Sequence, residues 1–144
     1  MTRSLLAAIF GLTALALPVH AQEAAATATP SLALELNALQ PADTGCRVTF
    51  LATNELGGVL DRAAVELALF DAGGTIVRIV TLDFKNLSQG KTKVLQFELP
   101  GLACPDLGRL LINDITACEG ADLAPTACLD NLVTTSRPDI TFGI

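Results

Sequence analysis

The chain of 144 residues contains no tryptophan, no tyrosine, one histidine and one methionine. The histidine, His20, and the methionine, Met1, both lie in the first 21 residues, which resemble an export signal. Once that signal is removed, no imidazole remains for a Ser-His-Asp triad, a Cys-His pair or a His-ligated catalytic metal. A glycosidase needs two opposed carboxylates in a cleft. The missing Trp and Tyr rings, which commonly stack on sugars, argue against such a cleft and against a carbohydrate-binding module.

The first 21 residues, MTRSLLAAIFGLTALALPVHA, have the three parts of a secretory signal. Arg3 is the positive n-region, residues 5–17 are the apolar core, and Val19-His20-Ala21 fits the small-x-small rule for signal peptidase. This pattern predicts cleavage after Ala21. The alternative is a retained anchor, but a membrane-spanning helix needs about 20 apolar residues, which is more than this run provides.

The predicted organisation is a signal peptide at 1–21, a flexible tether at 22–30 and one β-sandwich domain at 31–144. Cleavage removes Arg3, one of the nine basic residues, and none of the fifteen acidic ones, so the net charge falls from −6 to −7. Such an acidic chain is repelled by phosphate backbones and by anionic membranes. We therefore expect no nucleic-acid partner, no membrane association after cleavage, and a periplasmic or secreted protein.

All four cysteines lie in the part of the chain that remains after cleavage. An even number of cysteines in an exported protein predicts disulfides, because that compartment is oxidising. A four-thiolate zinc site is the alternative, but zinc sites usually contain close C-x₂-C pairs, and this sequence has none. The sequence thus predicts four disulfide-bonded cysteines, Cys46, Cys104, Cys118 and Cys128.

Short apolar runs separated by turn residues predict an all-β fold. The stretch 55–70 contains strong helix formers, yet the adjacent Gly57 and Gly58 oppose a helix, so we expect a loop at 55–63 followed by a strand. A final short segment is expected at 139–144, and no helix is expected. The predicted fold is a seven-stranded immunoglobulin/fibronectin-III-like β-sandwich with two disulfides and strands at 31–39, 46–53, 65–71, 75–84, 93–99, 108–116 and 131–136.

About a quarter of the chain, LALFDAGGTIVRIVTLDFKNLSQGKTKVLQFEL, resembles extracytoplasmic immunoglobulin-like domains of the FxLYD type. In those domains a strand ending L-[FY]-D meets a glycine turn, and a second strand leads to L-x-x-G. The whole chain also resembles small secreted proteobacterial proteins of unassigned function. The resemblance implies the fold and no reaction, and it rests on Leu69, Phe70, Asp71, Gly74, Leu87 and Gly90.

Four cysteines can pair in three ways, and strand direction selects one of them. Cys46 begins the second strand and Cys104 precedes the sixth, and these two strands run the same way in a sandwich of this class. Cys118 follows the sixth strand, about 30 Å farther along at about 3.3 Å per residue, whereas a disulfide needs Cα atoms within about 7 Å. The sequence therefore predicts Cys46–Cys104 and Cys118–Cys128.

The remaining candidates for chemistry have ordinary alternative explanations. Ser31, Ser88 and Ser136 with nearby Lys85, Lys91 and Lys93 suggest a Ser-Lys dyad, but we interpret these residues as solvated turn positions. Asn86-Leu87-Ser88 matches a glycosylation sequon of low specificity. A calcium site is a further alternative to a solvated acidic rim near the cysteine loop, with oxygen ligands from Asp114, Glu119, Asp122 and Asp130.

Taken as a whole, these patterns predict an exported, non-catalytic β-sandwich module with a binding or structural role. We expect no catalytic residue, no resident metal or cofactor and a monomer, with an unknown protein partner possible. The alternative is a subunit of a surface or periplasmic assembly that adds a strand, such as the segment 139–144, to a neighbour's sheet. A calcium-binding domain and an enzyme are weaker alternatives.

Overall fold

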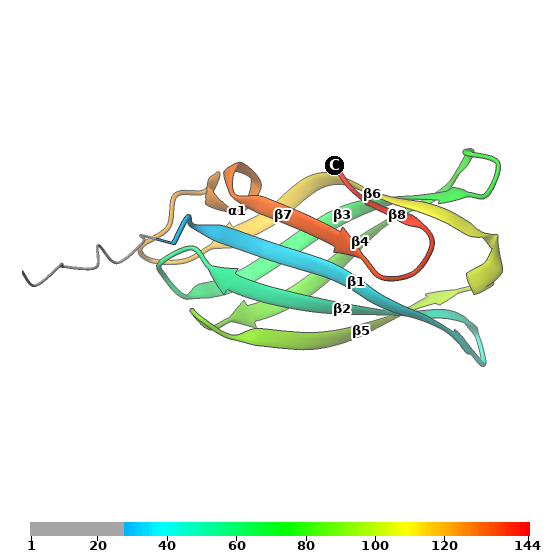
Figure 1. The fold of residues 1–144 in the computed structure, drawn as a ribbon, viewed down its shortest axis with the longest axis horizontal. Helices are drawn as coiled ribbons and strands as arrows, with labels where there is room; N and C mark the ends of the chain where they lie inside the picture. Colours follow the sequence, from blue (N-terminus) through cyan, green and yellow to red (C-terminus); the bar gives the residue numbers. More distant parts are fainter. Residues whose placement is uncertain (1–27) are drawn as a thin grey trace, which may run out of the picture.

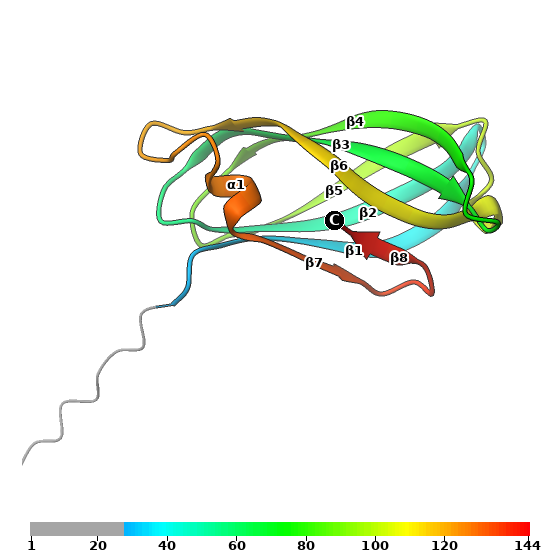
Figure 2. The same ribbon diagram turned by 90° about the horizontal axis from the view of Figure 1, so that it is seen from above.

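The computed structural model describes residues 28–144, which form a β-sandwich of two four-stranded sheets (Figures 1 and 2). Sheet A has the order β5-β2-β1-β7 and sheet B has the order β4-β3-β6-β8. The predicted signal peptide and most of the predicted tether lie outside the described residues. The strands are β1 (Ser31–Ala42), β2 (Gly45–Glu55), β3 (Leu60–Asp71), β4 (Ile76–Leu87), β5 (Thr92–Pro100), β6 (Leu107–Glu119), β7 (Leu132–Ser136) and β8 (Thr141–Gly143).

The predicted β-sandwich is confirmed, but it has eight strands rather than seven. The additional strand, β8, comes from the final segment 139–144 and pairs in parallel with β6. Its central residue, Phe142, is buried and packs on Phe50 of β2, with the ring centroids 5.3 Å apart. Burial of the Phe142 ring thus stabilises β8, a strand of three residues that is too short to be predicted from local sequence pattern.

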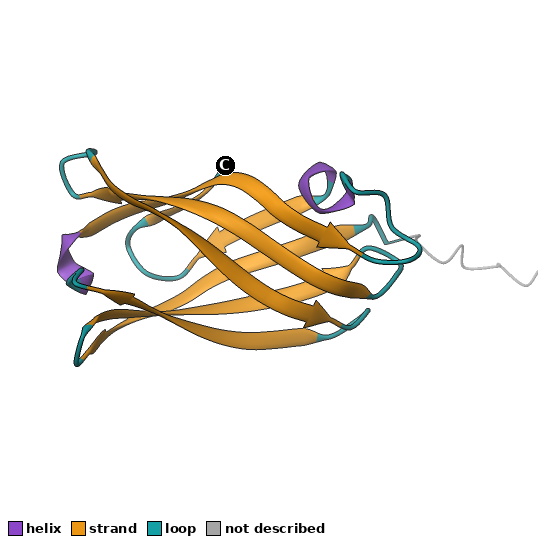
Figure 3. Cartoon of the chain, turned by 180° about the vertical axis from the view of Figure 1, so that it is seen from behind, coloured by secondary structure: helices purple, strands orange, loops and turns teal. Residues whose placement is uncertain are grey.

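Two further expectations need correction. The loop expected at 55–63 is shorter, because β3 begins at Leu60. The pairing of β3 with β4 shifts register between Leu60 and Ala63. The side chains of Leu60 and Ala63 are both buried. Two short helices also appear, η1 (Cys104–Asp106) and α1 (Ala127–Asp130), where no helix was expected (Figure 3). No helix within residues 28–144 is long and apolar enough to cross a membrane.

The order of the strands is that of an immunoglobulin sandwich with two changes. The neighbours β1, β2 and β5 correspond to strands A, B and E, and the neighbours β3 and β6 correspond to strands C and F. The first change concerns β4, which pairs with β3 in sheet B, whereas strand D of the seven-stranded type lies beside E in the other sheet. The second change concerns β7, which pairs in parallel with β1 in sheet A instead of pairing with β6. The short β8 occupies part of the edge of β6 that β7 leaves free (Figure 2).

The core between the sheets is aliphatic around one aromatic cluster. Leucines alternate inward on β1, as the period-two pattern predicts. Phe50 lies at the centre of the cluster and meets the rings of Phe84, Phe97 and Phe142 edge-on, at centroid distances of 5.7, 6.2 and 5.3 Å. These rings come from both sheets, so the cluster joins β2 and β5 to β4 and β8.

Candidate functional site

The four predicted cysteines form two disulfides at opposite ends of the sandwich, with the predicted pairing. Cys46 bonds Cys104 across a Cα–Cα distance of 4.9 Å, and Cys118 bonds Cys128 across 5.9 Å. Both β2 and β6 begin at the end opposite α1, so the direction argument is confirmed (Figure 1). The first disulfide joins the start of β2 in sheet A to η1, which leads into β6; the second joins the end of β6 to α1, which leads into β7.

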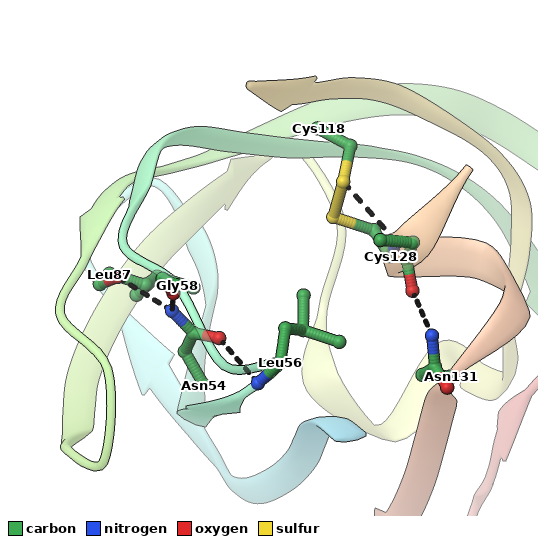
Figure 4. The surroundings of a disulfide bond; sticks show 8 residues. Asn54, Leu56, Gly58, Leu87, Cys118, Cys128 and Asn131 are labelled. Carbon is green, nitrogen blue, oxygen red and sulfur yellow. Dashed lines mark hydrogen bonds between the residues drawn. A yellow bond between two sulfur atoms is a disulfide. The ribbon is translucent and has the colours of Figure 1, made fainter. Parts of the chain in front are cut away.

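Next to the Cys118–Cys128 disulfide, the side chain of Asn54 is fully buried and fully hydrogen-bonded (Figure 4). Its Nδ2 donates to the carbonyl oxygens of Gly58 at 2.8 Å and Leu87 at 2.9 Å. Its Oδ1 accepts from the backbone N–H of Leu56 at 3.1 Å. Asn54 therefore ties the β2–β3 loop to the end of β4. The sequence analysis did not single it out, although an asparagine at the end of an apolar run before two glycines is a recognisable turn signal.

Asn54→Ala should lower the free energy of unfolding by about 2–3 kcal/mol, because it leaves buried backbone groups without partners. Urea unfolding followed by circular dichroism measures the change. The matched control is Asn113→Ala on β6, which removes an exposed side chain that bonds only Glu66 in the described residues and should cost little. Equal losses for the two variants would contradict the role assigned to Asn54.

The acidic residues near the cysteine loop do not converge. The carboxylate of Asp114 accepts a hydrogen bond from the backbone N–H of Ile115, and Glu119 lies 3.7 Å from Arg62. Asp122 and Asp130 are exposed. Within residues 28–144, His, Cys, Asp and Glu side chains form no group of three that could hold a metal ion.

Three of the six candidate lysines and serines form side-chain contacts within residues 28–144, and none of these contacts joins a serine to a lysine. Lys93 Nζ donates to the carbonyl oxygens of Phe84 and Asn86, at 3.2 and 3.0 Å. Lys85 Nζ lies 3.0 Å from the carboxylate of Asp83. Ser136 Oγ donates to the carbonyl oxygen of Pro138. Lys93 thus donates hydrogen bonds to backbone carbonyl oxygens, and Lys85 pairs with a carboxylate.

Among residues 28–144, three carboxyl groups have lowered pKa values, and hydrogen bonds at the surface are the main cause in each case. The backbone N–H and ammonium of Lys85, together with Arg62, lower the pKa of Asp83 from 3.8 to about 2. Hydrogen bonds from Asn37 and Arg137 lower the pKa of Glu35. These carboxylates are held in the charged form, as structural ion pairs are.

Hydrogen bonds also lower the pKa of Glu98: the bond from Arg47 has the larger effect, and the bond from Thr44 has a smaller one. A carboxyl group with a lowered folded-state pKa contributes stability that is present above its unfolded pKa and is lost as the pH falls toward its folded pKa. For Asp83 that window runs from 3.8 down to about 2.

The midpoint of urea unfolding should therefore fall as the pH drops through this window, and Asp83→Asn should make the fall shallower. The control is Asp61→Asn, which removes an exposed carboxylate of β3 that forms no ion pair among residues 28–144. A pH profile that is unchanged by Asp83→Asn would contradict the contribution of this group.

The outer face of sheet A has a shallow hollow of 260 Å³ that spans all four strands. Two cross-strand rows line it: Thr135, Glu35 and Leu51 in one, and Val133, Ala33, Thr53 and Thr92 in the other. Val94 pairs with Leu51 and extends the first row onto β5. We call these eight residues the sheet A face. Val94 and Val133 are exposed at 62% and 49%, so the sheet A face combines apolar side chains with threonine hydroxyls and the carboxylate of Glu35.

A second hollow, of 460 Å³, lies at the end of the sandwich opposite α1. It separates the β3–β4 turn from the loop between β5 and β6, and it is widely open. Asp71 on the rim of this hollow has a structural role, because its Oδ1 accepts a hydrogen bond from the backbone N–H of Thr75 at 2.8 Å. The hollow is lined by Asp71, Ala72, Gly73, Val77, Leu102, Pro105 and Asp106.

The residues that carry the resemblance to FxLYD-type domains all have structural places. Leu69 and Leu87 are buried in the core. Asp71 closes the β3–β4 turn, and Gly74 in that turn has a φ of +83°. Gly90, in the next turn, has a φ of +72°, a conformation that L-residues rarely adopt. These motif residues thus form turns and part of the core.

Comparison of the chain with family models, with curated proteins and with solved structures finds no match. The resemblance to FxLYD-type domains accordingly stays a prediction. The structure defines a class of protein: a disulfide-bonded β-sandwich with apolar side chains on the outside of its sheets. The two disulfides indicate an oxidising environment outside the cytoplasm.

Proposed function

We propose that this protein is an exported, non-catalytic β-sandwich module that binds a protein partner in the periplasm or outside the cell. The stretch 67–99 is proposed to form an FxLYD-type unit within it. Two disulfides support a scaffold that keeps its shape outside the cytoplasm. The hydrogen bonds that lower the pKa values of Glu35, Asp83 and Glu98 support structural roles for these three carboxylates, since a general acid requires a raised pKa instead.

The observation that carries the binding role is the exposure of β-branched side chains on the sheets. Strand residues that face the core are buried by the opposite sheet, but Val94 and Val133 point outward on edge strands of sheet A. Between them, Leu51 and Ala33 extend the apolar surface across the sheet. Apolar residues gathered beside hydrogen-bonding hydroxyls are typical of a protein-binding surface.

A native pull-down from the periplasmic fraction tests the proposal. The bait is the oxidised protein, and the comparison is the double variant Val94→Glu and Val133→Glu, which adds two charges to the sheet A face without touching the core. We expect a partner retained by the wild type and lost by the variant. Retention of the same partner by both proteins would reject the sheet A face as the binding surface.

The alternative function is a subunit of an assembly that adds its C-terminal segment to a neighbouring sheet. The observation that favours it is the small size of β8, whose three residues pair in parallel at the edge of sheet B. Parallel pairing is slightly less stable per residue than antiparallel pairing, so a longer antiparallel strand could replace it.

Deleting residues 139–144 distinguishes the alternatives. A module that uses β8 only internally should lose stability, because Phe142 leaves the aromatic cluster, and its oligomeric state should not change. An assembly subunit should form higher species when intact and lose them on truncation. Size-exclusion chromatography with light scattering measures the outcome, and Phe142→Leu serves as a milder variant if the truncated chain does not fold.

A further inference from the structure

The outer face of sheet B has three cross-strand rows of side chains on β4, β3 and β6. Their residues alternate with residues that pack in the core, so they point outward. We call them the sheet B face and name the rows by their chemistry: the arginine row (Ile76, Phe70 and Arg109), the middle row (Ile79, Ala68 and Leu111) and the acidic row (Thr81, Glu66 and Asp114).

The arginine row and the middle row form an apolar surface. Ile76 and Ile79 are exposed at 49% and 52%, and the side chains of Phe70 and Leu111 are half-buried. Ala68 lies between them and is buried, so no polar group interrupts the middle row. A gathered apolar surface of this kind on the outside of a sheet is typical of a docking site.

Arg109 adds a positive charge to one side of this surface. Its guanidinium lies 5.6 Å from the ring centroid of Phe70, and Arg109 forms no ion pair within residues 28–144. Arginine and aromatic residues are enriched at protein interfaces. The guanidinium is thus positioned by the ring and has no carboxylate partner in the part of the chain that the structure describes.

The acidic row adds negative charge to the other side. Glu66 accepts a hydrogen bond from Asn113 at 2.6 Å, and Asp114 accepts one from the backbone N–H of Ile115 at 2.8 Å. Both donors are uncharged, and neither carboxylate forms an ion pair among residues 28–144. The acidic row lies about 13 Å from the arginine row, at about 3.3 Å per residue, which is too far for the two rows to pair within one chain.

We propose that the sheet B face packs against the sheet B face of a second copy of this chain. The charges favour a second copy, because the face carries a cation and two anions on opposite sides of its apolar middle row. A two-fold axis along the middle row places the arginine row of each copy over the acidic row of the other. Arg109 of each copy then meets Glu66 and Asp114 of the other copy, and the two middle rows meet each other.

Charge also determines the orientation of the two copies. A two-fold axis parallel to the strands would place Arg109 over Ile76 of the other copy, and burying an unpaired guanidinium against an apolar side chain is costly. An axis across the strands avoids that contact. Two sheets that pack face to face lie about 10 Å apart with their strands nearly aligned, so an arginine and a carboxylate side chain reach each other. This inference is independent of the proposed function, which uses sheet A, and it departs from the monomer expected from the sequence.

Sedimentation velocity of the oxidised protein tests the dimer, at concentrations from about 1 to about 100 µM, which bracket micromolar Kd values. We expect a dimer within this range. Ile79→Lys should raise the Kd at least about tenfold, because it places two like charges at the centre of the middle row. Val133→Lys is the matched control, since it adds the same charge at a similarly exposed β-branched residue of sheet A, and it should leave the Kd unchanged.

A charge exchange tests the identity of the occupant and the orientation together. Arg109→Asp alone and Asp114→Arg alone should each raise the Kd at least about tenfold, because like charges then face each other across the axis. An equimolar mixture of the two variants should form a heterodimer, because residue 109 of each variant then faces an opposite charge at residue 114 of the other. If Asp114→Arg does not fold by circular dichroism, Glu66→Arg in the same row replaces it.

A wild-type protein that stays monomeric over the whole range, or a dimer that is unaffected by both Ile79→Lys and Arg109→Asp, would overturn the inference. A mixture of folded charge variants that stays monomeric would overturn the two-fold arrangement that we assign.

Discussion

Replacing Cys46 and Cys104 together by alanine should lower the free energy of unfolding by about 4 kcal/mol. The bond closes a loop with a sequence separation of 58, and in the chain-entropy model a longer loop removes more freedom from the unfolded chain. It also connects the start of β2 to η1, so the two sheets lose a covalent link at that end. Because small domains are stable by only about 5–15 kcal/mol, the loss is a large fraction of the total.

The matched control is the double variant Cys118→Ala and Cys128→Ala. This bond closes a separation of 10 residues, for which the same model gives about 3 kcal/mol. Urea unfolding of the wild type and the two variants measures both losses with every remaining cysteine paired. A larger loss for the Cys118–Cys128 variant would show that loop entropy is not the dominant contribution of these bonds.

Phe50→Ala should lower the free energy of unfolding by about 3–5 kcal/mol, as truncation of a fully buried aromatic side chain does. Phe50 is fully buried and contacts three other rings of the cluster. Removing the ring leaves a cavity between the sheets, because the surrounding strands β2, β4 and β8 can relax into the space only partly. Thermal unfolding followed by circular dichroism, and urea unfolding of the same samples, measure the change.

Phe70→Ala is the control for that substitution. Phe70 is half-buried on the outer face of sheet B, where the guanidinium of Arg109 lies 5.6 Å from its ring centroid. An exposed cation–π contact contributes about 0.5–1 kcal/mol, so this loss should be much smaller than that of Phe50→Ala. Similar losses would mean that the aromatic cluster is not the centre of the core.

The parts of the fold that follow from local pattern were predictable. Alternating leucines on β1 and the glycine turns at Gly74 and Gly90 give the strand sequence, because period and turn chemistry are local properties. The disulfide pairing was predictable too, since it follows from the direction of β2 and β6 once a sandwich is assumed. Cys46 and Cys104 then have to meet at one end.

The features that were missed depend on distant residues. The strand β8 forms because Phe142 packs on Phe50, 92 positions earlier in the chain, and no local pattern records that contact. Asn54 becomes important only when its side chain reaches the carbonyl oxygen of Leu87 on β4. The short helix α1 is held by the Cys118–Cys128 bond, so its four residues are helical through tertiary context rather than propensity.

Peptide mapping under non-reducing conditions, on the protein recovered from the periplasm or medium of expressing cells, tests the central claim most directly. The claim of an exported, disulfide-bonded scaffold predicts a chain that begins at Gln22, linked peptides containing Cys46–Cys104 and Cys118–Cys128, and no free thiol. A full-length, reduced chain in the cytoplasmic fraction, or a Cys46–Cys118 peptide, would contradict it.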